Sequence, residues 1–205
     1  MGKKVLLIVS MLLAVSAFGK DIDNNYIFSN GKTDFGGYVG MNGKVSSVFS
    51  ETNALGDIKA AVTFNGKWAL GISGTGLHFD DPANQLVSDG SYDLQVNYGG
   101  MFIERILSLS DRSKVSLSFL SGQGQASYRY DREYRKEKVW SEEMIDITTF
   151  GVQELGVDLH HRIGGNFWLG LTGSYRHTSP LQLIDTSDKL IEGFNGGLSI
   201  KYGIF

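Results

Sequence analysis

Cysteine is missing from the 205-residue chain, and proline occurs only twice. Without cysteine the chain forms no disulfide and offers no thiol to a lipid anchor, so it folds through non-covalent contacts alone. An excess of one charge sign is missing too, because 19 Lys and Arg stand against 22 Asp and Glu. A nucleic-acid-binding protein needs a clear excess of basic side chains, so this balance argues against nucleic acid as a partner.

Apolar runs long enough to span a membrane as a helix are missing as well. The main apolar run covers 5–15, where Lys3 and Lys4 precede it and small residues follow it. This order is typical of a secretory signal peptide, and we expect cleavage after Gly19. Cleavage removes two basic residues and no acidic one, which leaves a mildly acidic mature chain. The predicted organisation is a signal peptide over 1–19, a lead-in segment over 20–32 and a single domain over 33–205.

Glycine is plentiful instead, at 27 residues, and apolar side chains alternate with small or polar ones along much of the chain. The closing segment 193–205 is a good example, since apolar residues occupy most of its even positions and small or polar residues its odd ones. A period of two indicates a β-strand with one apolar face. The same pattern predicts eight strands, which begin near positions 35, 58, 68, 92, 115, 155, 167 and 193.

The connections between these predicted strands differ in length. Those at 65–67, 108–114 and 164–166 are short, and those at 80–91, 131–146 and 180–191 are long and polar. The connection at 50–54 is the exception, because it belongs to the end with the long loops and is itself short. An even strand number, with tight turns at one end and longer loops at the other, is typical of bacterial outer-membrane barrels. The sequence therefore predicts an all-β fold, an eight-stranded antiparallel up-and-down transmembrane β-barrel.

Period two does not show which face points outward, so a soluble ligand-binding barrel stays open as an alternative. The polar face mixes both charge signs with many small residues, which suits a narrow interior where opposite charges pair. We expect the apolar face to meet lipid, with aromatic girdles that include Phe64, Trp68, Phe167 and Tyr202. The polar positions expected inside are Asp34, Lys44, Lys59, Asp93, Arg129, Glu154, Asp158, Arg162, Arg176 and Lys201.

Three places in the pattern suggest local irregularities. The phase becomes ambiguous at Gly99 and Gly100, which we expect to host a bulge, and the next strand is expected to slip near Leu120. Strict alternation turns the terminal Phe205 inward, and a bulge at Gly203 is a hypothesis that would turn it toward lipid. Side chains fill the lumen of an eight-stranded barrel, so we expect no diffusion pore, although a narrow channel stays an alternative.

Three segments carry a resemblance to a known family: NYGGMFIERIL over 97–107, FGVQELGVDLHHRIGGNFWLGLTGSYRHTS over 150–179 and GFNGGLSIKYGIF over 193–205. They resemble small, largely uncharacterised bacterial outer-membrane β-barrel proteins, which share a Tyr-Gly-Gly before an apolar-Glu-aromatic stretch and a Gly-rich closing strand ending in Phe. This chain differs from them at Arg105, where an aromatic residue often follows the Glu, and at Ile204, where Lys often precedes the Phe. The resemblance implies the barrel fold and no activity.

We therefore expect export through the periplasm to the outer membrane of a gram-negative bacterium. The expected partners are outer-membrane lipid and lipopolysaccharide around the barrel, and barrel-assembly machinery that reads Phe205. The loop 131–144 is dense in both charge signs, and its Tyr134 and Trp140 are candidates for contact with an extracellular partner that the sequence does not name. His160 and His161 are adjacent and point to opposite faces of a strand, so no metal site or cofactor is expected.

One group of residues suggests catalysis. His177, Ser179 and Glu192 are similar in arrangement to the site of outer-membrane lipid A deacylases, which also use an eight-stranded barrel. His can deprotonate the Ser hydroxyl while Glu orients the imidazole. The deacylases follow the Ser with Asn-Ala, whereas Pro180-Leu181 follows here. The main hypothesis is a non-enzymatic barrel that contributes to envelope structure or surface contacts through its loops, and a lipid A deacylase is the alternative.

Overall fold

A computed structural model describes residues 33–48, 51–79, 91–131, 144–183 and 190–204. The chain divides into two units, Met1–Thr33 and Asp34–Phe205, and every element described below belongs to the second. The predicted signal peptide, the lead-in segment and Phe205 lie outside the described residues. None of the described residues forms a helix long and apolar enough to cross a membrane.

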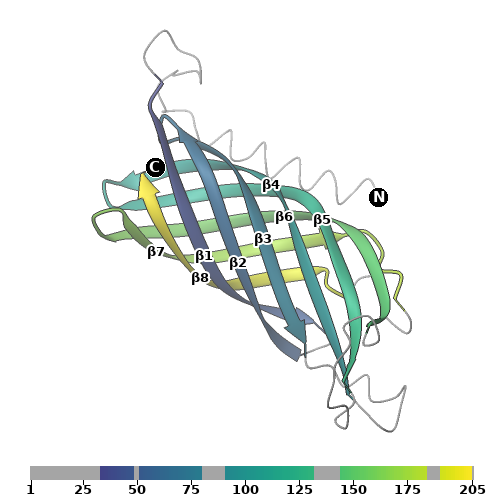
Figure 1. Cartoon of the computed structure of the whole chain (residues 1–205). Coiled ribbons are helices and arrows are strands. Elements are labelled where there is room, and N and C mark those ends of the chain that lie inside the picture. The colour runs from purple at the N-terminus through teal and green to yellow at the C-terminus, as the bar shows by residue number, and fades with distance from the viewer. Residues whose placement is uncertain (1–32, 49–50, 80–90, 132–143, 184–189, 205) are drawn as a thin grey trace, which may run out of the picture. The chain divides into compact units, whose positions relative to one another are not determined.

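Eight strands form one closed barrel, in which each strand is antiparallel to its neighbours (Figure 1). This confirms the predicted fold. The strands are β1 Phe35–Val48, β2 Glu51–Phe64, β3 Trp68–Phe79, β4 Ser91–Ser110, β5 Ser113–Asp131, β6 Met144–Gly164, β7 Phe167–Thr178 and β8 Gly193–Ile204. β8 closes the barrel on β1, with Ile204 opposite Gly37 and Asn195 opposite Ser46. The closed wall satisfies the backbone hydrogen bonds internally, as a membrane interior requires.

Short turns join the strands at one end of the barrel, which we call the turn end. Asn65 and Gly66 adopt positive φ angles of 53° and 62° in the β2–β3 turn, and Gly165 has a φ of 50° in the β6–β7 turn. Glycine tolerates this left-handed conformation without steric cost, as the predicted three-residue loop at 65–67 requires. The arrowhead of β8 lies at the same end (Figure 1). We call the opposite end, with the longer connections, the loop end.

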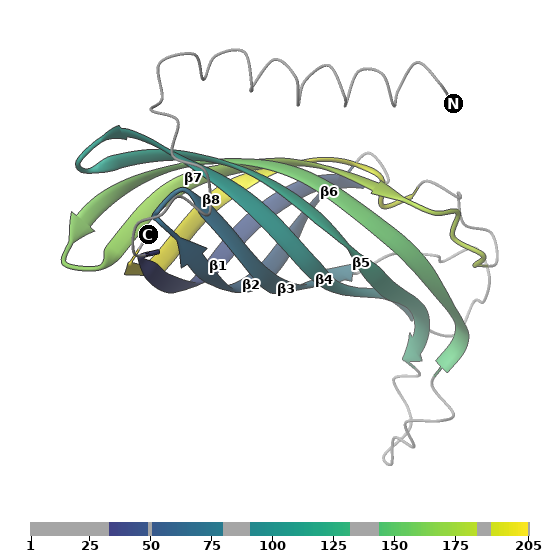
Figure 2. The ribbon, with the colours of Figure 1, turned by 90° about the horizontal axis from the view of Figure 1, so that it is seen from above.

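The strands differ in length around the barrel. β4, β5 and β6 contain 20, 19 and 21 residues, whereas β3, β7 and β8 contain 12 each. A tilted strand crosses a bilayer in about 10 residues. The β4–β6 wall is therefore long enough to project beyond the membrane, and its hairpins extend past the other strands in Figure 2.

The predicted irregularities at glycine were wrong. The β4–β5 register runs without a shift through Gly99, Gly100 and Leu120, so the strand neither bulges nor slips there. Glycine occurs at 100 because the strands approach closely, and a Cβ there would stand 2.7 Å from the Cα of Gly122. The observed shifts lie elsewhere, at Ser108/Ser110, Tyr128/Arg129 and Arg162/Gly164.

The bulge proposed at Gly203 is also absent from the β8 register. Gly203 pairs with Tyr38 and Ile204 with Gly37 in unbroken order. Close approach again explains the glycine, because a Cβ on Gly203 would lie 2.6 Å from the Cβ of Tyr38. The direction of Phe205 itself lies outside the described residues.

Candidate functional site

An apolar belt covers the outside of the barrel between two levels of aromatic side chains. Aromatic pairs at the turn end are Phe35 with Phe64 and Phe167 with Tyr202, whose ring centroids lie 5.6 Å and 4.7 Å apart. Toward the loop end, Tyr175 and Phe194 form a pair at 4.9 Å. The outward residues between these levels are Val39, Met41, Ile58, Val62, Leu70, Ile72, Met101, Ile103, Val157, Leu159, Leu169, Leu171, Leu198 and Ile200, all exposed.

The height of the belt is comparable with the apolar core of a bilayer. From Phe167 to Tyr175 the strand β7 advances roughly 26 Å along its own axis, and a tilt of about 40° reduces this to roughly 20 Å of height, against the ~25 Å apolar band of outer-membrane barrels. The predicted girdle residues, Phe64, Trp68, Phe167 and Tyr202, all belong to the turn-end level, because Phe64 pairs with Trp68 and Phe167 with Tyr202. An exposed apolar belt of this kind contradicts the soluble-barrel alternative.

The inside of the belt holds two clusters of buried ion pairs. In the cluster nearer the turn end, Lys201 Nζ on β8 lies 2.9 Å from Glu104 Oε1 on β4 and 3.4 Å from Asp158 Oδ2 on β6. The Tyr38 hydroxyl donates a hydrogen bond to Glu104, and His160 Nε2 lies 2.9 Å from Ser199 Oγ. Lys201 thus connects the last strand of the barrel to strands on the far side of the lumen.

The second cluster lies nearer the loop end. Lys44 Nζ on β1 contacts Asp57 Oδ2 at 2.7 Å and Glu154 Oε1 at 2.9 Å. The Tyr98 hydroxyl donates to Glu154 Oε2 over 2.7 Å, and Arg176 Nη1 donates to the Tyr98 oxygen over 3.2 Å. A cavity of about 10 Å³ beside Asp57 and Glu154 has room for about one water molecule.

Most of the residues expected inside are there. Lys44, Lys59, Glu154, Asp158, Arg176 and Lys201 are buried in the lumen, which confirms the prediction for these six. Asp34 and Arg162 are exposed at the turn end, where the prediction was wrong, because there the chain has reached the rim of the barrel. The side chains of Asp93 and Arg129 lie outside those the structure describes.

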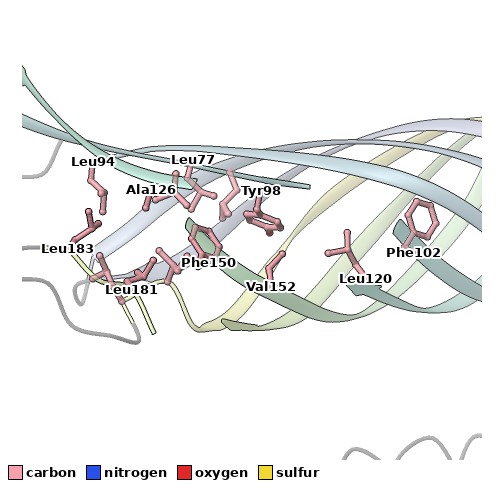
Figure 3. Close-up of a cluster of buried hydrophobic side chains, with 14 of the residues drawn as sticks. Leu77, Leu94, Tyr98, Phe102, Leu120, Ala126, Phe150, Val152, Leu181 and Leu183 are labelled. Carbon is pink, nitrogen blue, oxygen red and sulfur yellow. The ribbon is translucent and has the colours of Figure 1, made fainter. Parts of the chain in front are cut away.

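At the loop end the interior becomes apolar, which the sequence pattern did not predict. Leu94, Val96 and Tyr98 of β4 were expected on the lipid-facing side, yet they point inward and are buried. We call the cluster that they join the apolar plug (Figure 3). Its members include Leu55, Leu77, Leu94, Val96, Ala126, Phe150, Val152, Leu181, Leu183, Leu190 and Ile191.

The β7–β8 connection supplies part of the apolar plug. Leu181 and Leu183 follow β7, and Figure 3 shows both beside the side chains of the barrel wall. On the other side of the connection, the carbonyl oxygen of Ile191 accepts a 2.6 Å hydrogen bond from Nε of the buried Arg176. The described parts of the connection, 179–183 and 190–192, therefore add apolar side chains to the interior at the loop end. The sequence would predict such a plug only if the apolar residues of the predicted loop, such as Leu181 and Leu183, were considered together with those of the strands.

The structure brings together two of the three candidate catalytic residues. Nδ1 of His177 lies 3.2 Å from Oε2 of Glu192, and the Tyr175 hydroxyl donates to Oε1 of the same carboxylate over 2.8 Å. Ser179 is exposed like His177, but its Oγ accepts a 2.9 Å hydrogen bond from the Gly151 amide. In the described part of the chain, no hydrogen bond joins His177 to Ser179.

The remaining candidates have no described geometry. Tyr134 and Trp140, the candidate loop contacts, lie outside the described residues. Within the described residues no group of three or more His, Asp or Glu side chains is placed to hold a metal ion.

Comparison with known proteins yields structural similarity alone. No family model matches the chain, and no curated protein matches it. Neisserial surface protein A is similar over 85% of this chain and 99% of its own, with a TM-score of 0.54 and 12% identity. The N-terminal β-barrel domain of Pseudomonas aeruginosa OprF matches 84% of this chain and 100% of its own, with a TM-score of 0.49 and 11% identity.

Ail, the attachment invasion locus protein of Yersinia pestis, matches 83% of this chain and 98% of its own, with a TM-score of 0.48 and 12% identity. At such identities a match shows the fold, and the similarity to Neisserial surface protein A is the one that carries it. The closed barrel, the lipid-facing belt and the ionic lumen are those of a transmembrane β-barrel of the gram-negative outer membrane.

Proposed function

We propose that this protein is a non-enzymatic outer-membrane barrel that acts in envelope structure and surface contacts rather than in transport. The supporting observation is the filled lumen. Lys44 and Lys201 bridge it with ion pairs to strands on other sides of the barrel, and the apolar plug covers them at the loop end. Among the described residues, these side chains occupy the path that water and solutes would take, and the loops are left as the part that meets other molecules.

The proposal includes the route by which the chain reaches the membrane. The signal peptide over 1–19 directs export, barrel-assembly machinery reads the terminal Phe205, and lipopolysaccharide surrounds the outer half of the belt. Tyr134 and Trp140 are the proposed contacts for an extracellular partner.

Two measurements test the sealed barrel. Purified protein in detergent is expected to change its gel mobility on boiling, as a folded barrel does, and to give no steady conductance in planar bilayers. Steady conductance through the wild-type protein would contradict the proposal and favour the narrow channel. Deleting the gene is expected to alter envelope permeability or surface binding while the set of lipid A species stays the same.

A second candidate function is lipid A deacylation, which the contact between His177 and Glu192 favours. His177 is exposed two residues beyond Tyr175 on β7, and the largely covered Glu192 carboxylate contacts both side chains, near the level expected of lipid A. In this function Glu192 orients the imidazole and His177 activates Ser179. The hydrogen bond from the Gly151 amide to Ser179 instead gives the hydroxyl a structural role at the end of β7.

Mass spectra of lipid A separate the two functions. Cells that express the wild-type protein, the Ser179→Ala variant or no protein are compared. Identical lipid A in all three supports the non-enzymatic barrel. Loss of one acyl chain in cells with the wild-type protein, but not in cells with the Ser179→Ala variant, would establish the deacylase.

A further inference from the structure

Arg105 interrupts the apolar outward row of β4. Its neighbours on that row are Ile103 and Leu107, while Glu104 and Ile106 point into the lumen. A charged side chain on the lipid-facing side of a barrel is strongly unfavourable at the centre of the bilayer and nearly neutral at its surface. What Arg105 implies about function therefore depends on its depth in the bilayer.

The register places Arg105 at the surface of the membrane. It pairs with Trp68, the first residue of β3 after the turn, and Trp68 in turn pairs with Phe64 of the turn-end girdle. The Arg105 guanidinium carbon lies 4.8 Å from the centroid of the Trp68 ring. This distance is that of a cation–π contact, which keeps the guanidinium beside an indole at the level of the lipid headgroups.

The guanidinium retains its hydrogen-bonding capacity. The indole contact is the only interaction recorded for the Arg105 side chain among the described residues, and it involves no carboxylate. A guanidinium presents a rigid fork of N–H donors that matches the oxygens of a phosphate. Arg105 can thus contact the Trp68 ring and still donate hydrogen bonds to an anion.

The surroundings have the same charge sign. Around the turn end the described residues include five basic and two acidic side chains, a net charge of +3, whereas the whole chain has a net charge of −3. Basic residues beside a membrane surface attract anionic lipid over about a Debye length. The basic residues are Lys67, Arg105, Arg112, Lys114 and Arg162, and the acidic ones are Asp34 and Asp111.

We propose that Arg105 and Trp68 form a binding site for the phosphate of an anionic phospholipid in the periplasmic leaflet. The guanidinium binds the phosphate oxygens, the indole lies beside the glycerol region, and Ile103 contacts the acyl chains below. The other turn-end cations add attraction that does not depend on one geometry. This site goes beyond the proposed function and requires only the outer-membrane location.

Native mass spectrometry of the full protein in detergent tests the site. Phosphatidylglycerol, phosphatidylcholine and inorganic phosphate are titrated in turn against wild type and the variants Arg105→Gln, Trp68→Leu and Arg112→Gln. Arg112 is the matched control, since it is exposed in the β4–β5 turn and its loss removes the same charge from the same end. A shift in gel mobility on boiling verifies that each variant is folded.

Wild type is expected to retain phosphatidylglycerol in preference to phosphatidylcholine. Arg105→Gln should weaken that binding about tenfold, the effect of losing a charge-assisted hydrogen bond, and Arg112→Gln by less than about twofold. Trp68→Leu should fall between them. Equal losses in Arg105→Gln and Arg112→Gln would reduce the effect to general electrostatics and overturn the site. Unchanged binding in Arg105→Gln, or full competition by inorganic phosphate at the lipid concentration, would overturn it as well.

Discussion

The two halves of the barrel use opposite arrangements of the same side-chain alternation. In the half inside the belt, apolar residues face outward and the lumen holds the paired charges, as Ile103 and Glu104 show on adjacent positions of β4, together with buried apolar side chains such as Phe102. In the half nearer the loop end, Asn97 is exposed and Val96 is fully buried on the same strand. The inversion shows that burial depends on what surrounds the wall, lipid in one half and water in the other.

The residues that face the lumen at each height depend on what the outer face meets at that height. Within the belt, the outward side chains are the ones that contact lipid. The inward positions can therefore hold charged residues, provided that opposite charges pair across the lumen. Beyond the belt, water solvates the outer face, and the interior becomes an ordinary apolar core closed by Leu181 and Leu183. The change from ionic to apolar interior occurs near Tyr98, whose ring belongs to the apolar plug and whose hydroxyl belongs to the second ionic cluster.

The largest expected effect is in the ionic half. Lys201→Met leaves Glu104 and Asp158 buried without their shared cation, which should lower the free energy of unfolding by about 3–5 kcal/mol. Unfolding by denaturant in lipid vesicles measures this. The double variant Lys201→Met with Glu104→Gln should recover part of the loss, and no recovery would mean that Lys201 acts by packing alone.

The next largest difference is expected for a charged residue introduced on the outer surface, which should destabilise the belt half and not the loop-end half. Leu171 lies midway between the Phe167 and Tyr175 levels, so Leu171→Lys should cost about 2–4 kcal/mol, the cost of a Lys near the bilayer midplane. Gln123→Lys, on the exposed surface of β5 beyond the belt, should change stability by less than about 0.5 kcal/mol. Equal costs at both positions would contradict the placement of the belt.

Truncation in the apolar plug should have a smaller effect. Val96→Ala removes two buried carbon atoms and leaves a small cavity, so it should lower the free energy of unfolding by about 2 kcal/mol. Because the ion pairs below stay intact, gel mobility before and after boiling should match wild type. If the variant no longer folds, the apolar plug is required for the barrel to form.

The smallest effect is expected at the boundary between the halves. Tyr175→Phe removes the hydrogen bond to Glu192 and keeps the ring contact with Phe194, so it should cost about 0.5–1.5 kcal/mol. Denaturant unfolding measures the change, with Tyr202→Phe at the turn-end girdle as the control. Equal losses in the two variants would mean that the hydrogen bond from Tyr175 to Glu192 adds no stability at the boundary.

The alternation correctly predicted the faces of β8 and six of the ten expected lumen charges, because each of those positions meets only one environment. Leu198 and Ile200 face lipid, while Ser199 and Lys201 face the lumen along their whole strand segment. On β4 and β5 the same reasoning failed, since an apolar residue was taken to face lipid wherever it occurred. The expected bulge and slip were ways to keep Leu94 and Leu120 on assigned faces, and the structure needs neither.

By itself the sequence determined the strand number, the places of the short turns and which charged residues of the belt half face inward, because period two and turn chemistry are local properties of the chain. The tertiary structure decided what each face meets at each height. It also brought His177 to Glu192, Arg105 to Trp68 and the β7–β8 connection into the barrel mouth, since these contacts depend on register and closure between segments far apart along the chain.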